Sequence, residues 1–277
     1  MLLSMFFLAC LDYNLDAKVK TALPADTGIL DDSSDITVDT ATDTGVVDTG
    51  YEEPVVEEVD PEIAQAKIYA NTSGELYEVN PDSGELLYIG AFMENGEPVD
   101  HFEDIAIDLS GHMYGGTGEY LYLINPTTAQ VRSICPLDIA TTALTFTSRG
   151  ELILGVDSTL YKLNVQTCAL QVLIANSFYE TSGDIVGLPD GYLYWSVRGG
   201  NADHLIKVDP NTGIEEWVGN IGESRLYGMG YANDILFGFS GSGRIVRIDP
   251  NTGSSSFFKQ LDTVSWWGAT TNPVLWD

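Results

Sequence analysis

Eight residues have side chains that could bind or transform a ligand, provided that the fold brings them together. They are His101, Glu103, Asp104, Asp184, Arg198, His204, Arg225 and Trp266. Two carboxyl groups about 5–5.5 Å or 6.5–9.5 Å apart can cleave a glycosidic bond, so Asp184 with Glu103 or Asp104 is a candidate pair. Without cleavage, acids, imidazoles, guanidinium groups and an indole together suit a small polar ligand, a sugar or a peptide end.

Several features of the sequence argue against catalysis. Glu103 and Asp104 are adjacent, and neighbouring residues of a strand point to opposite faces, so at most one of them faces a central channel. The sequence has no Gly-x-Ser-x-Gly elbow, no phosphate-binding glycine loop and no His/Cys/Asp trio with metal spacing. We therefore expect a binding protein without a cofactor or metal, and keep an enzyme as the alternative.

A degenerate repeat shows which elements must position these residues. The motif Leu-Tyr-x-hydrophobic-Asn/Asp-Pro-x-Thr/Ser-Gly occurs at residues 76–84, 121–129, 160–168, 205–213 and 245–253. Its Asn/Asp positions are 39 to 45 residues apart. Such a period, built from short alternating segments and Gly-rich turns, is typical of the four-stranded blades of a β-propeller. The Asn/Asp-Pro segments themselves favour hairpin turns, which explains the carboxylates of Asp209 and Asp249 without catalysis.

The two ends of the repeat region complete each other. The first unit, residues 67–90, has no inner strand before it, and residues 264–270 form a strand with no partner after it. Pairing them would close a ring and remove two exposed sheet edges. The sequence therefore predicts an all-β, five-bladed propeller over residues 66–277. A sixth, unrecognised blade is the main alternative, although about 210 residues leave little room for it.

The connectivity of such a ring predicts where a ligand would bind. Loops from one blade to the next share a rim, and the Asn/Asp-Pro turns lie on the opposite rim. Two long loops on the first rim, residues 91–102 and 197–204, carry His101, Arg198 and His204. The inner strands would begin at the same rim, with Glu103, Asp104, Asp184, Arg225 and Trp266 near the channel mouth. A solvated rim of ordinary loops is the alternative, and Trp266 could equally pack in the core.

The N-terminal residues suggest export and a lipid anchor. Residues 1–9 are apolar and predict a signal peptide, although no Lys or Arg precedes them. Phe7-Leu8-Ala9-Cys10 resembles the lipobox of bacterial lipoproteins, with Phe7 in place of the usual Leu. The resemblance implies that Cys10 carries a diacylglyceryl group and becomes the mature N-terminus. The alternative is a truncated ordinary signal peptide with an incidental cysteine.

The segment that follows has the composition of a tether. Residues 11–65 hold 15 acidic and two basic residues, mostly among Asp, Thr, Ser, Val, Glu and Pro, with no sustained period. Such a segment cannot bury enough apolar surface to offset its chain entropy, so we expect disorder. Residues 10–65 are therefore predicted to be a lipidated cysteine with a flexible linker, whose span is about 40 Å at about 5–6 Å × √n.

Charge and cysteine content narrow the partners and the compartment. With 12 basic and 41 acidic residues, a net charge of −29 disfavours nucleic acids and anionic lipid surfaces, while calcium or a cationic partner remains possible. If Cys10 is acylated, Cys135 and Cys168 remain as a pair in an oxidising compartment. Their pairing stays open, because the repeat places Cys135 at the end of an outer strand and Cys168 in a turn on the opposite rim. A disulfide needs Cα atoms within about 7 Å.

The repeats resemble those of the YVTN/NHL/quinoprotein-like group of β-propellers, across residues 66–277. With Cys10 and the Asp/Thr-rich spacer, the whole chain resembles propeller lipoproteins of bacteria such as myxobacteria. That group includes scaffolds, sensors and enzymes, so the resemblance implies a fold and leaves function open. The Trp and Gly features of quinoprotein dehydrogenases are not recognisable, so a quinone cofactor is not implied.

These observations predict a monomeric, lipid-anchored, extracytoplasmic binding module at the bacterial cell envelope, on the outer membrane or the cell surface. Its partner would be a protein or a glycan. One alternative is a carbohydrate-active hydrolase that uses carboxylates at the channel mouth. Another is an outer-membrane assembly factor, which would bind strands by adding them to an open sheet edge.

Overall fold

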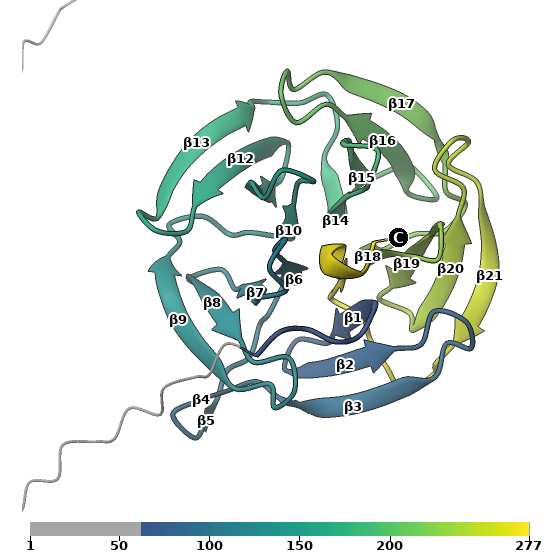
Figure 1. Ribbon diagram of the computed structural model, residues 1–277. Helices are drawn as coiled ribbons and strands as arrows, with labels where there is room; N and C mark the ends of the chain where they lie inside the picture. Colours follow the sequence, from purple (N-terminus) through teal and green to yellow (C-terminus); the bar gives the residue numbers. More distant parts are fainter. Residues whose placement is uncertain (1–61, 277) are drawn as a thin grey trace, which may run out of the picture. The chain divides into compact units, whose positions relative to one another are not determined.

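The computed structural model describes residues 62–276, which form five four-stranded antiparallel sheets arranged in a ring (Figure 1). The predicted five-bladed propeller is confirmed, and the described residues contain no sixth blade. The predictions for residues 1–61, namely the signal peptide, Cys10 and most of the linker, lie outside the described part of the chain. The linker's last residues, 62–65, are described and contain no strand.

The blades are numbered along the chain, and the strands of each are given from the channel outward. Blade 1 contains β22 (Gly268–Thr271), β1 (Ile68–Asn71), β2 (Glu75–Val79) and β3 (Leu86–Ala91). Blade 2 contains β6 (Asp104–Ile107), β7 (Met113–Gly116), β8 (Tyr120–Ile124) and β9 (Val131–Pro136). Blade 3 contains β10 (Ala143–Phe146), β11 (Leu152–Val156), β12 (Thr159–Asn164) and β13 (Ala169–Ile174). Blade 4 contains β14 (Thr181–Gly187), β15 (Leu193–Val197), β16 (His204–Val208) and β17 (Glu215–Asn220). Blade 5 contains β18 (Leu226–Ala232), β19 (Ile235–Ser240), β20 (Arg244–Ile248) and β21 (Ser255–Gln260).

The ring closes as the sequence predicts, because β22 supplies the inner strand that the first repeat lacks. Tyr69 pairs with Thr270, and Ala70 pairs with Ala269. The strand begins later than the predicted residue 264, since the chain first turns through a hydrogen bond from Val264 N to Leu261 O. A short 3-10 helix, η1 (Pro273–Leu275), follows β22.

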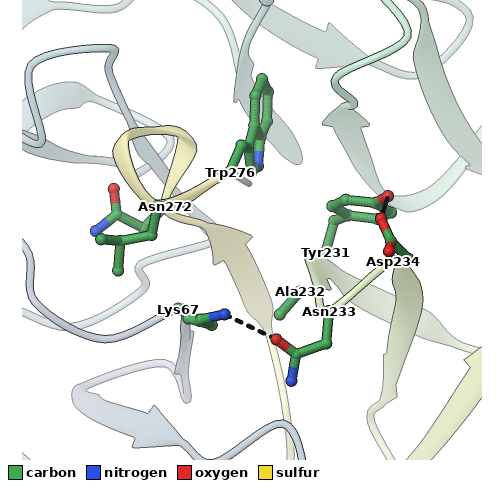
Figure 2. A pocket seen from close by; sticks show the side chains of 8 residues that line it. Lys67, Tyr231, Ala232, Asn233, Asp234, Asn272 and Trp276 are labelled. Carbon is green, nitrogen blue, oxygen red and sulfur yellow. Dashed lines mark hydrogen bonds between the residues drawn. The ribbon is translucent and has the colours of Figure 1, made fainter.

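A small pocket marks the closing seam between blades 1 and 5 (Figure 2). It has a volume of about 120 Å³, and its walls include Lys67, Tyr231, Asn233 and Trp276. Lys67 Nζ donates to Asn233 Oδ1 at 2.8 Å, and the Trp276 indole donates to Thr271 Oγ1 at 3.0 Å. Its polar groups therefore hold the two ends of the ring together.

The Asn/Asp-Pro motifs form the predicted hairpin turns. Asp209 Oδ1 accepts from Asn211 N at 2.8 Å, and Asp249 Oδ1 accepts from Asn251 N at 2.9 Å. These backbone hydrogen bonds lower the pKa values of both carboxyl groups. Each turn ends in a residue with positive φ, and these residues are Gly84, Ala129, Cys168, Gly213 and Gly253. The interpretation of Asp209 and Asp249 as turn residues is confirmed.

Every outermost strand carries a β-bulge at the same position. The pairing register shifts at Leu76/Tyr77 in blade 1, and at the equivalent point of the other four blades. The residues skipped by the pairing are all apolar and pack inward against the blade clusters: Ile89, Ile134, Leu173, Val218 and Phe258. A bulge twists an edge strand, and this discourages pairing with another strand.

The residue after each bulge contacts the positive-φ turn residue of the next blade. A Cβ on Gly90 would lie 3.3 Å from Ala129 Cβ, and one on Gly253 would lie 2.8 Å from Gly219 Cα. A Cβ on Gly213 would lie 3.2 Å from Ile174 Cγ1, and one on Gly84 would lie 3.3 Å from Lys259 Cβ. The same contact thus recurs around the ring, because the outer strands run along its circumference and the end of each reaches the next blade (Figure 1).

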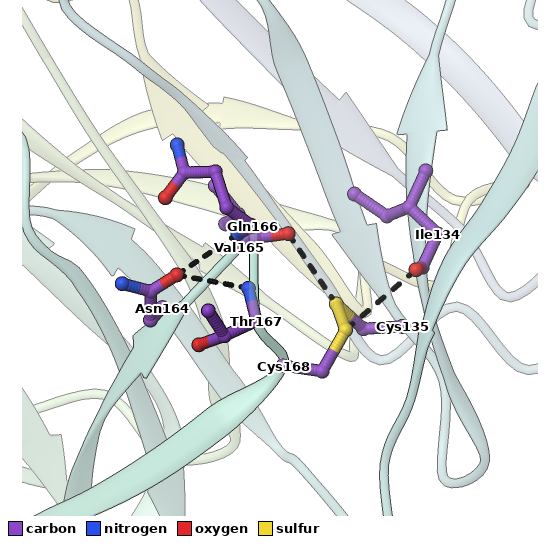
Figure 3. The surroundings of a disulfide bond; sticks show 7 residues. All are labelled: Ile134, Cys135, Asn164, Val165, Gln166, Thr167 and Cys168. Carbon is purple, nitrogen blue, oxygen red and sulfur yellow. Dashed lines mark hydrogen bonds between the residues drawn. A yellow bond between two sulfur atoms is a disulfide. The ribbon is translucent and has the colours of Figure 1, made fainter. Parts of the chain in front are cut away.

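At the equivalent position between blades 2 and 3 the contact is a disulfide (Figure 3). Cys135 and Cys168 are bonded, with Cα atoms 5.5 Å apart. The repeat alignment suggested that the two residues lie on opposite rims. That objection does not hold, because the inclined outer strand carries Cys135 of one blade to the turn of its neighbour.

Candidate functional site

A pocket of about 300 Å³ lies where the innermost strands begin. Each blade contributes one residue to its wall: Glu103, Thr142, Gly183, Tyr227 and Trp267. Ser182 and Arg198 complete the lining. The five residues come from equivalent points of the repeat, next to β6, β10 and β22 or near the starts of β14 and β18. This is the channel-mouth pocket, and it lies on the rim that the sequence predicts for a ligand.

Glycine residues allow the Tyr227 side chain to reach the channel-mouth pocket. A Cβ on Gly183 would lie 2.3 Å from Tyr227 Cα, and one on Gly241 would lie 2.7 Å from Tyr227 Cε2. Any larger residue would clash with Tyr227 at either position. Gly183 therefore lets the backbones of blades 4 and 5 approach closely, while Gly241 of blade 5 leaves room for the Tyr227 ring.

Trp267 is fixed by its backbone and leaves its indole at the pocket. Its N–H donates to Asn71 O at 2.9 Å, which extends the pairing of β22 with β1. The ring centroid lies 6.3 Å from that of His101. Trp266, in contrast, is fully buried and packs edge-on against Tyr77 and Phe239. Trp266, which was predicted to contact a ligand, thus packs in the core, and the adjacent Trp267 lines the channel-mouth pocket instead.

The channel-mouth pocket contains four polar groups without a hydrogen-bond or ion-pair partner among the described residues. Within residues 62–276, no hydrogen bond or ion pair involves the Glu103 carboxylate, the Arg198 guanidinium, the Trp267 indole N–H or the Tyr227 hydroxyl. Glu103 is half-buried, and this burial raises the pKa of its carboxyl group, while His101 acts in the opposite direction. Arg198 is exposed and the other three residues are half-buried, so all four groups are accessible to a ligand in the pocket.

Asp104 and Asp184 are not part of the pocket wall, because both carboxyl groups are fully buried inside the ring. Asp104 Oδ1 accepts from Ile105 N at 2.8 Å, and its Oδ2 accepts from Leu144 N of blade 3 at 2.6 Å. Asp184 accepts from Ile185 N of its own strand and from Met229 N of blade 5. Each carboxyl group therefore joins its blade to the next one.

The two carboxyl groups also interact electrostatically, and the two residues are named the aspartate pair. Burial raises both pKa values well above the ordinary range, and the charge of Asp184 raises that of Asp104 further. Two neighbouring carboxyl groups do not both ionise readily, so the aspartate pair retains a proton to a higher pH than a free carboxyl group does. Gly268 makes room for it, because a Cβ there would lie 2.4 Å from Asp104 Oδ1.

The other predicted residues lie around the rim. His101 and Arg225 are exposed and have positive φ values of 67° and 57°. The His204 ring packs edge-on against Trp217 with centroids 4.5 Å apart, away from the channel-mouth pocket. Of the eight predicted residues, the structure places Glu103 and Arg198 in the pocket and His101 beside it.

The sequence analysis missed Thr142, Ser182, Tyr227 and Trp267 as lining residues. Glu103, Thr142, Gly183, Tyr227 and Trp267 stand at one position of the repeat, so a full alignment of the innermost strands was the signal that could have found most of them. Those strands carry weaker motifs than the hairpin turns.

Residues 62–276 contain no group of three or more His, Cys, Asp or Glu side chains that could hold a metal ion. No helix in this part of the chain has the length and apolar character required to span a membrane.

Comparison with solved structures supports the fold. A crystal structure of a nidogen/laminin complex aligns over 76% of this chain and 82% of that chain, with a TM-score of 0.53 and 13% sequence identity. At this identity the likeness shows the β-propeller fold alone. No family model and no curated protein matches the chain.

Two other structures align less closely. Hydrazine synthase from Kuenenia stuttgartiensis has a TM-score of 0.43 and 13% identity, over 59% of this chain and 50% of that chain. A protein of unknown function from Bacteroides thetaiotaomicron VPI-5482 has a TM-score of 0.49 and 14% identity, over 75% of this chain and 61% of that chain. The aligned part thus spans half of the first protein and less than two thirds of the second. The resemblance to the YVTN/NHL/quinoprotein-like group stays a prediction.

Proposed function

We propose that the protein is a binding module whose channel-mouth pocket takes a sugar unit of a glycan. The observation that carries this proposal is a single pocket with two aromatic side chains and four polar groups that lack partners among residues 62–276. Aromatic walls with a few placed polar groups are typical of ligand sites, and about 300 Å³ is the lower end of their usual size.

A sugar fits this chemistry better than an apolar or polyanionic ligand. The C–H face of a pyranose can stack on Trp267 or Tyr227, while its hydroxyl groups can bond to Glu103, Arg198 and the indole N–H. The net charge of −29 repels polyanions. A ligand of one or two units would suit a pocket of this volume.

We further propose that the module is a lipid-anchored, extracytoplasmic lipoprotein of the YVTN/NHL/quinoprotein-like kind, at the cell envelope. The Cys135–Cys168 disulfide supports an oxidising compartment. The described chain begins on the rim opposite the channel-mouth pocket, where Ala64 N donates to Gly111 O and Thr127 Oγ1 donates to Glu62 Oε2. A tether attached there would present the pocket away from the membrane.

The other two functions receive less support from the geometry. The carboxyl groups of the aspartate pair are fully buried, whereas a glycosidase needs its two carboxyl groups in an open cleft. Strand addition would need a flat open edge. All five outer strands carry a β-bulge. In addition, a hairpin formed by β4 (Met93–Glu94) and β5 (Glu97–Pro98) covers part of β9, where Ser133 N donates a hydrogen bond to Glu94 Oε1 at 2.7 Å.

A glycan array tests the proposed function. We expect the wild-type chain to bind a defined set of glycans, and Trp267→Ala to weaken binding about tenfold or more, the loss of about 1.4 kcal/mol. Trp217→Ala is the matched control, because Trp217 is 49% exposed on β17 and does not line the pocket. Equal binding by wild type and Trp267→Ala would contradict the proposal, and so would the absence of any glycan ligand.

A further inference from the structure

The two charged residues of the channel-mouth pocket differ in exposure. Arg198 is exposed, whereas Glu103 is half-buried, and neither side chain forms an ion pair within residues 62–276. The Glu103 carboxylate also accepts no hydrogen bond from these residues. Burial raises the pKa of its carboxyl group, and the exposed His101 lowers it by less.

A half-buried carboxylate that accepts no hydrogen bond and forms no ion pair is suited to binding a cation. Removing a carboxylate from water is unfavourable unless another group compensates for the lost hydration. Glu103 shares the pocket with Trp267 and Tyr227, whose ring faces also attract cations. The acidic ring adds a long-range field of the same sign, which favours a positively charged ligand.

We propose that Glu103 receives a primary ammonium group, and that the ligand of the channel-mouth pocket is a glycan with a free, non-acetylated amino sugar. The inference rests on the proposed glycan-binding function and names its ligand class. The ammonium group would donate to the Glu103 carboxylate, while the sugar ring stacks on an aromatic wall. An N-acetylated sugar would leave the Glu103 charge without a partner.

The experiment compares matched pairs of sugars that differ in acetylation. Glucosamine, galactosamine and mannosamine, with glucosamine tetrasaccharide, are titrated against their N-acetylated counterparts by isothermal titration calorimetry at pH 6.5, using the full chain. We expect at least one amino sugar to bind at least tenfold more tightly than its acetylated form. Raising the salt concentration should reduce this preference, because part of it is electrostatic.

Variants of Glu103 and Glu216 separate the local charge from the net charge. Glu103→Gln keeps the size of the side chain and should remove the preference, mainly by weakening the amino form. Glu216→Gln removes the same charge from the exposed face of β17 and should leave both affinities unchanged. A preference that survives in Glu103→Gln would overturn the inference.

The outcomes also separate this inference from the proposed function. If neutral glycans bind in a Trp267-dependent manner and no amino sugar is preferred, the ammonium inference fails and the glycan-binding function stands. If no glycan or amino sugar binds at all, both fail. Circular dichroism of Glu103→Gln establishes that the variant is folded, so a loss of binding can be assigned to the site.

Discussion

At the scale of single residues, the aspartate pair links four blades through two side chains. Asp104 of blade 2 reaches blade 3, Asp184 of blade 4 reaches blade 5, and the two interact inside the ring. Because each oxygen accepts a backbone N–H, the pair stabilises the ring while it retains its proton.

This arrangement predicts a loss of stability as the pH rises above the unfolded pKa of the aspartates. The folded pKa values of both aspartates are raised above the unfolded value of about 3.9, so the folded state holds a proton that the unfolded state releases. The free energy of unfolding should fall as the pH rises from about 4 to the folded pKa, by at most about 1.4 kcal/mol per pH unit for one proton. Urea denaturation from pH 5 to 9 measures the slope.

Asp104→Asn isolates the contribution of the aspartate pair. Its amide can donate to Asp184 without a titrating proton, so the variant should be less stable at pH 5 and show a shallower slope. The difference between wild type and variant removes the effect of the other titrating groups. Parallel slopes for the two proteins would show that the pair does not retain a proton.

A second prediction at this scale concerns Gly183. Gly183→Ala places a methyl group 2.3 Å from Tyr227 Cα, so blades 4 and 5 must separate. We expect a loss of about 1–3 kcal/mol in stability together with weaker glycan binding. Thermal unfolding and the array measure both. Gly200→Ala is the control, because a Cβ there contacts nothing within 4 Å.

Some site residues escaped prediction because the strand entries are irregular. His101 and Arg225 adopt left-handed conformations just before β6 and β18, and such a residue interrupts the alternation on which side-chain directions were based. Trp266 and Trp267 lie just before β22 (Gly268–Thr271), so the alternation of a strand could not assign them to core and pocket. The complete burial of Asp104 and Asp184 also depends on partners in other blades, which no local pattern shows.

At the scale of elements, the blade-to-blade contact explains the position of the disulfide. Turn chemistry could be predicted from the sequence, because Asn/Asp, Pro and Gly act locally. The five bulges could not, since they depend on how each outer strand fits the neighbouring blade. The sequence therefore located Cys135 and Cys168 within their own blades but not relative to each other.

The recurrence of this contact allows a second disulfide to be introduced. Gly90 and Ala129 occupy the places of Cys135 and Cys168 one blade earlier, and a Cβ on Gly90 would lie 3.3 Å from Ala129 Cβ. Ala129 and Cys168 both have a φ of 58°. We expect the Gly90→Cys/Ala129→Cys protein to form this disulfide. Its free energy of unfolding should then be about 2–4 kcal/mol higher than that of its reduced form. Free thiols in the folded, oxidised double variant would contradict the equivalence of the contacts.

At the scale of the whole molecule, the two rims have different roles. One holds the channel-mouth pocket, and the other holds the Asn/Asp-Pro turns, the closing seam and the first described residues. The repeat and its closure could be predicted almost completely, because a period in the sequence becomes a period in space. Ligand identity could not be predicted, since it depends on a few residues at the channel mouth.

The proposed anchor makes a prediction about where the whole protein is found. Cys10→Ser should move the chain from the membrane fraction to the soluble extracytoplasmic fraction, because the lipid can no longer be attached. Fractionation with immunodetection measures this, and metabolic labelling with palmitate should mark the wild type alone. If the wild-type protein is found in the soluble fraction and its Cys10 is unmodified, the lipoprotein proposal is contradicted.

The most direct test of the central claim is a crystal structure of the protein with the tightest glycan from the array. The account predicts a sugar ring in the channel-mouth pocket, stacked on Trp267 or Tyr227, with its amino group within hydrogen-bonding distance of Glu103. A glycan bound on the outer strands or at the closing seam beside Lys67, with the channel mouth empty, would contradict it.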